Sequence, residues 1–305
     1  MNHCLLSSYE EDHFAWISMR TQVFYFLSIP NRLKWYTGSG FSTRGVMEET
    51  LHKTAEARRD THDVQTYRVR SYECGPDGRV LFSHLCNYLQ ETASVHAQKL
   101  GFSKKNFEPM GLTWVLTRMR VRLDAYPAWG EDVVVLTYPR SMRKLTAYRD
   151  FVLSRPDGAP MGVATSEWMV MDINSRRAGR LPELVGACAN NVRPPVWEGE
   201  AFGRLEFPEA EDAIALKFAV QHSHIDLNRH VNNVRYLEWM MECAPEAGSG
   251  SRVADMEVVF RGEARHGDVV VARCAPCRDG ARMHQVATQD GRELITARTR
   301  WTRLD

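Results

Sequence analysis

The apolar positions of this chain change their spacing twice within its first half. Residues 66–73 alternate as a half-buried strand does, and the turn residues of 74–78 end the alternation. Apolar positions at helical spacing follow from Ser83, a suitable helix N-cap, and stop at Gly101. The predicted buried face of this helix carries Leu85, Leu89, Thr92, His96 and Leu100. Long segments rich in β-branched and aromatic residues come next, so we predict a strand, one helix and an antiparallel sheet.

The second half repeats this order of elements. A strand at 213–222, a polar turn and a helix from Asn233 to Cys243 precede further strand-like segments. The predicted buried stripe of that helix is Val234, Leu237, Met241 and Ala244. The two helices share the tripeptides YLQ at 88–90 and YLE at 236–238, which indicates two copies of one α+β unit. A curved antiparallel sheet wrapped round one central helix is the hotdog fold, so we predict a tandem (double) hotdog.

The chain divides into four segments on this interpretation. Residues 1–63 form an N-terminal extension that we expect to be disordered or not translated, with Met47 as a candidate start. Residues 64–178 form the first hotdog and residues 209–305 the second. The segment 179–208, punctuated by Pro and Gly, is the predicted linker between them.

Composition and charge exclude some classes of partner. The formal net charge is +1, which gives no overall attraction to nucleic acid or to a membrane surface. The longest early apolar run, 23–29, is too short to span a bilayer. Seven cysteines without regular spacing indicate a reducing compartment, for which we predict the cytoplasm. Cys274 and Cys277 form an isolated pair that lacks the further ligands of a zinc site, so no metal is predicted.

One segment of the second half concentrates polar side chains of catalytic types. Asp226, Asn228 and His230 follow one another at steps of two, so an extended backbone places all three on one side. Asn232 or Asn233 then caps the helix, whose first N–H groups favour a carbonyl oxygen that becomes an oxyanion. A carboxylate, an amide and an imidazole beside such a helix start are the parts needed for acyl transfer to water. An Asn-rich turn that satisfies its own backbone explains the asparagines, but neither Asp226 nor His230.

The matching place in the first half carries no such side chains. Aligning YLQ with YLE puts Gly78, Val80 and Phe82 there. Chemistry is therefore predicted in the second hotdog and acyl binding in the first. The candidate acyl-pocket residues are Tyr88, Leu89 and Thr92.

From about residue 66 to its C-terminus the chain resembles the plant-type acyl-acyl carrier protein (acyl-ACP) thioesterases. The segments that carry this resemblance are YLQETASVHAQKLGFS (88–103), GLTWVLTRMRVRLDAYPAWGEDVVV (111–135), ATSEWMVMDINSRR (164–177) and DLNRHVNNVRYLEW (226–239). The resemblance implies a tandem hotdog that hydrolyses the thioester between a fatty acyl chain and its carrier protein in fatty acid biosynthesis. No cofactor is predicted.

By this resemblance the family's Asp, Asn and His fall on Asp226, Asn228 and His230, and a further Glu falls on Glu263. The Cys that follows this Glu in the family is Ala264 here, so no thiol is expected to attack the substrate. His230 is then assigned to hold and polarise Asp226 or the water, Asn228 to orient the thioester, and Glu263 to position water. Asp226 either activates water or attacks the carbonyl directly, and the sequence leaves both routes open.

Carrier proteins of the implied kind are acidic, and the chain has a basic excess within 118–149. A solvated sheet face explains such charges one by one, but a basic surface beside the pocket also steers an acidic partner. The predicted docking residues are Arg140, Arg143, Lys144, Arg176 and Arg177.

Other functions and settings stay open at this point. An acyl-CoA thioesterase of the same fold acts on the same pantetheine arm. A hotdog hydratase or dehydratase usually has Pro after the Asn and a wider spacing of Asp and His, which DLNRH lacks. A non-catalytic acyl-binding regulator needs an output module, and residues 1–60 contain no helix-turn-helix pattern. The plastid is the alternative compartment, and a homodimer is an alternative assembly.

Overall fold

The computed structural model describes residues 62–143, 145–179, 193–199 and 201–303, and the backbone of four early strands. These strands are β1 (Leu6–Ser8), β2 (Phe14–Met19), β3 (Gln22–Ile29) and β4 (Arg32–Thr37). They form an antiparallel sheet in the order β1-β2-β3-β4, within a compact unit that comprises Met1–Lys53. The sequence pattern predicted no strand in this segment, because its apolar residues show no clear period.

Thr54–Asp305 form a second compact unit, the main body, which contains both predicted hotdogs. The elements of the first hotdog are β5 (Asp63–Arg68), η1 (Ser71–Glu73), α2 (Phe82–Lys99), α3 (Lys104–Phe107), η2 (Glu108–Met110), β6 (Leu112–Leu123), β7 (Asp132–Arg143), β8 (Thr146–Ser154) and β9 (Pro160–Asp172). Those of the second are β10 (Ile214–Ala219), η3 (His222–His224), α5 (Asn233–Glu242), β11 (Ser251–Phe260), β12 (Val269–Pro276), β13 (Arg282–Thr288) and β14 (Glu293–Arg303).

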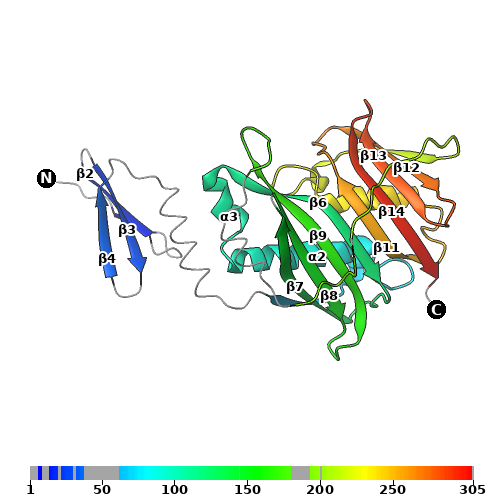
Figure 1. The fold of residues 1–305 in the computed structure, drawn as a ribbon, viewed down its shortest axis with the longest axis horizontal. Helices are drawn as coiled ribbons and strands as arrows, with labels where there is room; N and C mark the ends of the chain where they lie inside the picture. Colours follow the sequence, from blue (N-terminus) through cyan, green and yellow to red (C-terminus); the bar gives the residue numbers. More distant parts are fainter. Residues whose placement is uncertain are drawn as a thin grey trace. The chain divides into compact units, whose positions relative to one another are not determined.

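The strands of the main body form one ten-stranded antiparallel sheet in the order β10-β12-β13-β14-β11-β6-β9-β8-β7-β5 (Figure 1). From either end of the sheet to its middle, the strands of the two hotdogs follow the same order. Strands β5, β7, β8, β9 and β6 of the first correspond to β10, β12, β13, β14 and β11 of the second. The halves meet where β6 pairs with β11, with Met119 opposite Val258 and Arg120 opposite Glu257. The predicted double hotdog is therefore confirmed, and its two halves share one sheet.

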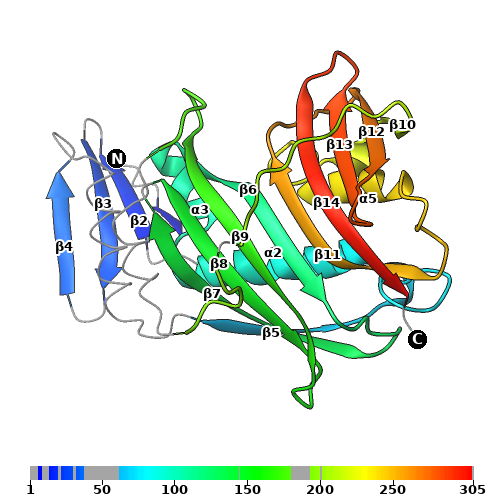
Figure 2. The ribbon, with the colours of Figure 1, turned by 45° about the vertical axis from the view of Figure 1, so that its right-hand side comes forward.

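Helices α2 and α5 lie against one face of this sheet and pack against each other (Figure 2). The whole predicted face of α2, from Leu85 to Leu100, is buried. In α5, Leu237 and Met240 are at most 1% exposed. Because apolar side chains of both helices belong to one continuous core, burial of apolar area holds the two hotdogs together.

Two details of the helices differ from the sequence prediction. Helix α2 begins at Phe82, with Leu81 rather than Ser83 at the N-cap. The backbone N–H of Leu81 donates to the carbonyl of Glu73 at 2.8 Å, so the preceding turn fixes where the helix starts. In α5 Met241 is half-buried while Met240 is fully buried, because core side chains contact a wider arc of this helix than the predicted stripe.

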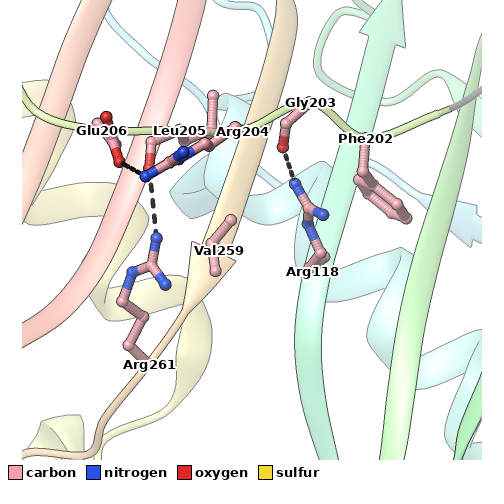
Figure 3. Close-up of a pocket in the computed structure, with 8 residues that line it drawn as sticks. All are labelled: Arg118, Phe202, Gly203, Arg204, Leu205, Glu206, Val259 and Arg261. Carbon is pink, nitrogen blue, oxygen red and sulfur yellow. Dashed lines mark hydrogen bonds and ion pairs between the residues drawn. The ribbon is translucent and has the colours of Figure 1, made fainter.

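Arginines of β6 anchor the inter-hotdog linker on the sheet face opposite the helices. Arg118 donates to the carbonyl of Gly203, and its guanidinium lies 4.8 Å from the centroid of the Phe202 ring (Figure 3). Arg120 donates to the carbonyl of Ala201 at 3.2 Å. The linker therefore crosses the β6–β11 junction.

A shallow pocket of about 520 Å³ lies beside this crossing (Figure 3). Its three arginines each form an ion pair: Arg118 with Glu257, Arg204 with Glu206, and Arg261 with Glu293. The pocket is lined by Arg118, Phe202, Gly203, Arg204, Leu205, Glu206, Val259 and Arg261. Since a glutamate already pairs with each of these arginines, we interpret the pocket as a gap in the packing between the linker and the sheet, and not as a binding site.

Tyr126 offers a test of how the two hotdogs are tied together. Its side chain is 2% exposed, and its hydroxyl donates to the carbonyl of Val253 in β11 at 2.7 Å. Tyr126→Phe leaves this buried carbonyl short of a partner, so we expect the free energy of unfolding in urea to fall by about 1–2 kcal/mol.

Tyr72→Phe is the matched control for this substitution. Tyr72 is 72% exposed, so losing its hydroxyl should change the free energy of unfolding by less than about 0.5 kcal/mol. Equal stability of the Tyr126→Phe and wild-type chains would contradict the role given to this hydrogen bond.

Candidate active site

Residues 225–231 form a tight hairpin immediately before α5, closed by an isolated antiparallel bridge. The backbone N–H of Asp226 donates to the carbonyl of His230 at 2.9 Å, and that of Arg229 donates to the carbonyl of Asp226 at 3.0 Å. Arg229 has a φ of 64°, in the left-handed region. The predicted extended lead-in is therefore wrong, because a turn rather than strand alternation sets the directions of the polar side chains.

Asp226 and Asn228 are in direct contact within this turn. Oδ1 of Asp226 accepts a hydrogen bond from the backbone N–H of Asn228 at 2.7 Å, and Oδ2 accepts one from Asn228 Nδ2 at 3.4 Å. The Asp226 side chain is half-buried and Asn228 is exposed. An aspartate commonly makes such a bond in a turn. Here it orients the carboxylate while part of the side chain stays exposed to solvent.

His230 and Glu263 form the second contact of the site. Nε2 of His230 lies 3.4 Å from Oε2 of Glu263, and the two side chains are 28% and 33% exposed. Glu263 lies in the connection between β11 and β12, so it reaches the hairpin from a different element. The structure thus brings the four predicted catalytic residues together as two contacting pairs on adjoining segments.

Backbone contacts hold the Glu263 connection against the hairpin. The N–H of Val231 donates to the carbonyl of Ala264 at 3.3 Å, and the N–H of Ala264 donates to the Tyr236 hydroxyl of α5 at 2.8 Å. Arg292 Nη2 donates to the carbonyl of Glu263 at 3.2 Å. Burial raises the pKa of Tyr236 to about 12, so its phenol stays protonated at neutral pH.

The start of α5 is capped by Asn232, which settles the choice between the two asparagines. Its side-chain oxygen accepts from the N–H of Val234 at 2.9 Å, and its carbonyl accepts from the N–H of Arg235 at the same distance. These two N–H groups therefore have partners within the helix start. The N–H groups of Val234 and Arg235 are therefore not free to bind an oxyanion, as the predicted role of the helix start requires.

Cys243, at the C-terminal end of α5, is not activated. Cys243 is 1% exposed, its Sγ lies 3.3 Å from the carbonyl of Ala272, and burial raises its pKa to about 11. Because the thiolate is the nucleophilic form, this thiol is inert at neutral pH. Ala264, where the resemblance would have a cysteine, is fully buried.

The first hotdog contains a hairpin of the same geometry. The N–H of Gly75 donates to the carbonyl of Arg79 at 2.9 Å, and the N–H of Gly78 to the carbonyl of Gly75 at the same distance. The structural counterparts of Asp226, Asn228 and His230 are therefore Gly75, Asp77 and Arg79. The counterparts predicted from the shared tripeptide, Gly78, Val80 and Phe82, are wrong by three positions.

The polar side chains of the first hairpin are engaged in structural contacts. Asp77 forms an ion pair with Arg252, and Arg79 Nη1 donates to the carbonyl of Tyr126 at 2.8 Å. Gly75 has no side chain, so no carboxylate stands where Asp226 does. The two hairpins therefore share a backbone geometry but differ in the side chains that they present.

The predicted acyl-pocket residues all lie in the core of the first hotdog. Tyr88 is 4% exposed, stacks on Tyr67 with 4.5 Å between ring centroids, and donates to a carboxylate oxygen of Glu73 at 2.5 Å. Thr92 Oγ1 lies 2.9 Å from the Tyr67 hydroxyl, and both Thr92 and Leu89 are fully buried. These contacts place polar hydroxyls along α2 inside an otherwise apolar core.

The predicted docking residues fall into different environments. Arg140 forms an ion pair at 3.3 Å with Asp150, whose side chain is buried, so this arginine has a structural partner. Arg143 and Arg177 are exposed. Arg176 is paired with Glu263. Lys144 lies outside the described residues.

Two side chains of the first hotdog reach this site and were not predicted to do so. Arg176 Nη2 donates to Oε2 of Glu263 at 2.8 Å. Lys104 Nζ donates at 2.9 Å to the carbonyl of Leu227, which is 92% exposed at the tip of the hairpin. Arg176 stands in a segment that carries the family resemblance, but no spacing along the chain connects it to residue 263.

Two further findings bear on the kind of site. Within the described part of the chain, no three His, Cys, Asp or Glu side chains gather as they would around a metal ion. None of the described helices is both long and apolar enough to cross a membrane.

The chain matches two models of one protein family. Residues 60–187 match the acyl-ACP thioesterase N-terminal domain, and residues 208–303 match the acyl-ACP thioesterase C-terminal domain. The first match covers the first hotdog and the second covers the hairpin, α5 and Glu263.

Comparison with individual proteins agrees with these matches. The palmitoyl-acyl carrier protein thioesterase, chloroplastic, of Gossypium hirsutum is 30% identical over 260 residues, which cover 78% of this chain and 63% of that protein. The chain thus spans about three fifths of the length of the curated relatives it matches.

Solved structures share the fold. The acyl-ACP thioesterase of Bacteroides thetaiotaomicron superposes with a TM-score of 0.71 at 22% identity, covering 84% of this chain and 99% of that one. The 12:0-ACP thioesterase of Umbellularia californica does so with a TM-score of 0.72 at 23% identity, covering 80% and 98%. Because the two models of this family match residues 60–187 and 208–303, the chain belongs to the acyl-ACP thioesterase family.

Proposed function

We propose that this chain hydrolyses the thioester between a fatty acyl chain and acyl carrier protein, and so releases free fatty acid in fatty acid biosynthesis. The observation that carries the proposal is the contact of His230 with Glu263 beside the Asp226–Asn228 pair, in a chain of this family. The name of the Gossypium hirsutum relative describes the same class of reaction. An acyl-CoA thioesterase is the alternative, since CoA and carrier protein present the same pantetheine arm.

The proposed reaction begins with attack of an oxygen nucleophile on the thioester carbonyl carbon. When water attacks, its proton passes to a basic side chain, the tetrahedral intermediate collapses, the C–S bond breaks, and the leaving thiolate takes up a proton. Glu263 positions the water, and His230, 3.4 Å from Glu263, polarises it. Asn228 orients the thioester. Asp226 acts either as the base for this water or as a nucleophile whose acyl anhydride water then hydrolyses.

The same proposal covers acyl binding, docking of the carrier protein and the cellular compartment. The acyl chain binds in the first hotdog near Tyr88, Leu89 and Thr92. The acidic carrier protein meets the exposed Arg143 and Arg177. Of the two compartments, the plastid is supported by the chloroplastic names of the relatives, and the cytoplasm by the scattered cysteines.

Substitution of the hairpin residues tests the proposed site. We expect Asp226→Asn and His230→Ala each to lower kcat for release of thiol from acyl carrier protein by about 10²–10⁴-fold, because each removes a group that handles a proton. Both side chains are outside the apolar core, so circular dichroism and thermal melting should stay close to wild type.

Asp157→Asn is the matched control for Asp226→Asn. Oδ1 of Asp157 accepts from the N–H of Ala159 at 2.9 Å in an exposed turn, just as Asp226 accepts from Asn228. This variant should keep wild-type turnover. Retained activity in both hairpin variants would place the chemistry elsewhere.

Alkylation distinguishes the proposed route from a thiol mechanism. Because burial keeps Cys243 protonated, iodoacetamide under native conditions should leave turnover nearly unchanged, whereas Glu263→Ala should lower kcat by about 10²-fold or more. Cys243→Ala removes the thiol and little volume. Inactivation of the wild type but not of Cys243→Ala, with Glu263→Ala still active, would replace this mechanism by one through Cys243.

Charge reversal tests the docking surface. The Arg143→Glu/Arg177→Glu double variant should raise KM for carrier-linked substrate far more than for a small soluble thioester, because steering acts on the charged partner. The difference should fade with added salt, which screens charges beyond about 10 Å at 0.1 M. Arg155→Glu, at an exposed position in the β8–β9 turn, is the control for a change in net charge alone and should leave both KM values close to wild type. Equal effects on both substrates would exclude docking at this surface.

A further inference from the structure

The chain makes an unusual turn where it leaves β9. The N–H groups of Asn174 and Ser175 donate to Oδ1 of Asp172 at 3.1 and 2.7 Å, and the N–H of Arg176 donates to the carbonyl of Asp172 at 2.9 Å. Arg176 itself has a φ of 57°. A non-glycine residue in this region is disfavoured by roughly 1 kcal/mol or more, and such strain persists where its surroundings over-determine it.

Among the described residues, the non-glycine residues with a positive φ are Arg176 and Arg229. Arg229 lies in the catalytic hairpin of the second hotdog. Arg176 lies in the first hotdog, and its side chain crosses to the same site. Both strained positions therefore belong to one place in the molecule, although they come from different halves of the chain.

Arg176 and His230 share one oxygen of Glu263. Oε2 lies 2.8 Å from Nη2 of Arg176 and 3.4 Å from Nε2 of His230. The shorter of these contacts, from Arg176, is a charge-assisted hydrogen bond, which fixes the orientation of the Glu263 carboxylate. Without it, the half-exposed Glu263 side chain has several rotamers open to solvent.

The charged and titratable groups around His230 come from five elements. Asp226 belongs to its own hairpin, and Glu263 to the connection after β11. Arg292 donates to the carbonyl of Glu263 at 3.2 Å from the turn before β14, and Tyr236 of α5 accepts from the neighbouring Ala264. Arg176, from the first hotdog, is the guanidinium that contacts the Glu263 carboxylate itself.

We propose that Arg176 is a positioning residue, supplied by the first hotdog, that directs Glu263 towards His230 and balances its charge. The catalytic half is then complete only when the first hotdog is docked on it. This inference rests on the proposed function. It replaces a docking role for Arg176, whereas the neighbouring Arg177 has no ion-pair partner among the described residues and stays available to the carrier protein.

The test compares four variants of the full chain: Arg176→Gln, Arg176→Lys, Arg176→Gly and, as the matched control, Arg177→Gln. Each is assayed for kcat and KM on an acyl carrier protein thioester and on a small soluble thioester, and its melting temperature is measured. We expect Arg176→Gln to lower kcat about tenfold on both substrates, with little change in KM, since a lost interaction of about 1.4 kcal/mol in the transition state has this effect.

Arg176→Lys tests the geometry of the contact separately from its charge. It keeps the positive charge without the planar fork of the guanidinium, so it should restore part of kcat.

Arg176→Gly separates this role from a structural one. Glycine adopts a φ of 57° without strain, so the melting temperature should be equal to or above that of the wild type while kcat falls as in Arg176→Gln. Arg177→Gln should affect only KM for the carrier-linked substrate.

Wild-type kcat in Arg176→Gln on both substrates would overturn the inference and leave the proposed function intact, provided that His230→Ala is inactive. A loss confined to KM for the carrier-linked substrate, equal in Arg176→Gln and Arg177→Gln, would return Arg176 to the docking surface. An active His230→Ala would remove the proposed site itself.

Discussion

The pairing of β6 with β11 is the contact on which the rest of this molecule depends. It joins two hotdogs into one sheet, so that α2 and α5 share a continuous core on one face. On the other face, ion pairs from Arg118 and Arg120 of β6 to Glu257 and Asp255 of β11 cross the same junction. Partly exposed ion pairs of this kind contribute less than the burial of apolar area. The junction also fixes how the two halves lie against each other. The contact of Arg176 in the first half with Glu263 in the second depends on this arrangement.

The two hotdogs keep one backbone design and use it differently. In both, a short 3-10 turn leads into a tight hairpin and then the central helix, with equivalent backbone hydrogen bonds in each hairpin. The first hairpin carries Gly75, Asp77 and Arg79, whose polar side chains hold neighbouring elements. The second carries Asp226, Asn228 and His230, which are half-buried or exposed. The proposed chemistry therefore depends on the side chains of a shared turn rather than on the fold.

The fold was largely predictable because its signals are local and occur twice. The face of α2 from Leu85 to Leu100 follows helical spacing, and all of it is buried. The register between the halves was not predictable from the shared tripeptide, since the Tyr-Leu pair lies deeper in α2 than in α5. The starts of β5 and β10, and of η1 and η3, give the true correspondence.

The site was predictable in part, for a related reason. Asp226, Asn228 and His230 are neighbours in sequence, so their types and spacing identify them. Glu263 came only from the family resemblance, because its contact with His230 depends on the connection after β11. Arg176 reaches the site through the β6–β11 junction and a left-handed backbone position, neither of which a sequence pattern encodes.

The most direct test of this account is thiol release by the purified chain from a panel of fatty acyl thioesters on acyl carrier protein and on CoA, with free fatty acid measured in parallel. The account predicts equal amounts of free thiol and fatty acid, with the carrier-linked thioesters hydrolysed more efficiently than those of CoA. Loss of thioester without thiol release, or no hydrolysis of any carrier-linked acyl chain, would contradict it.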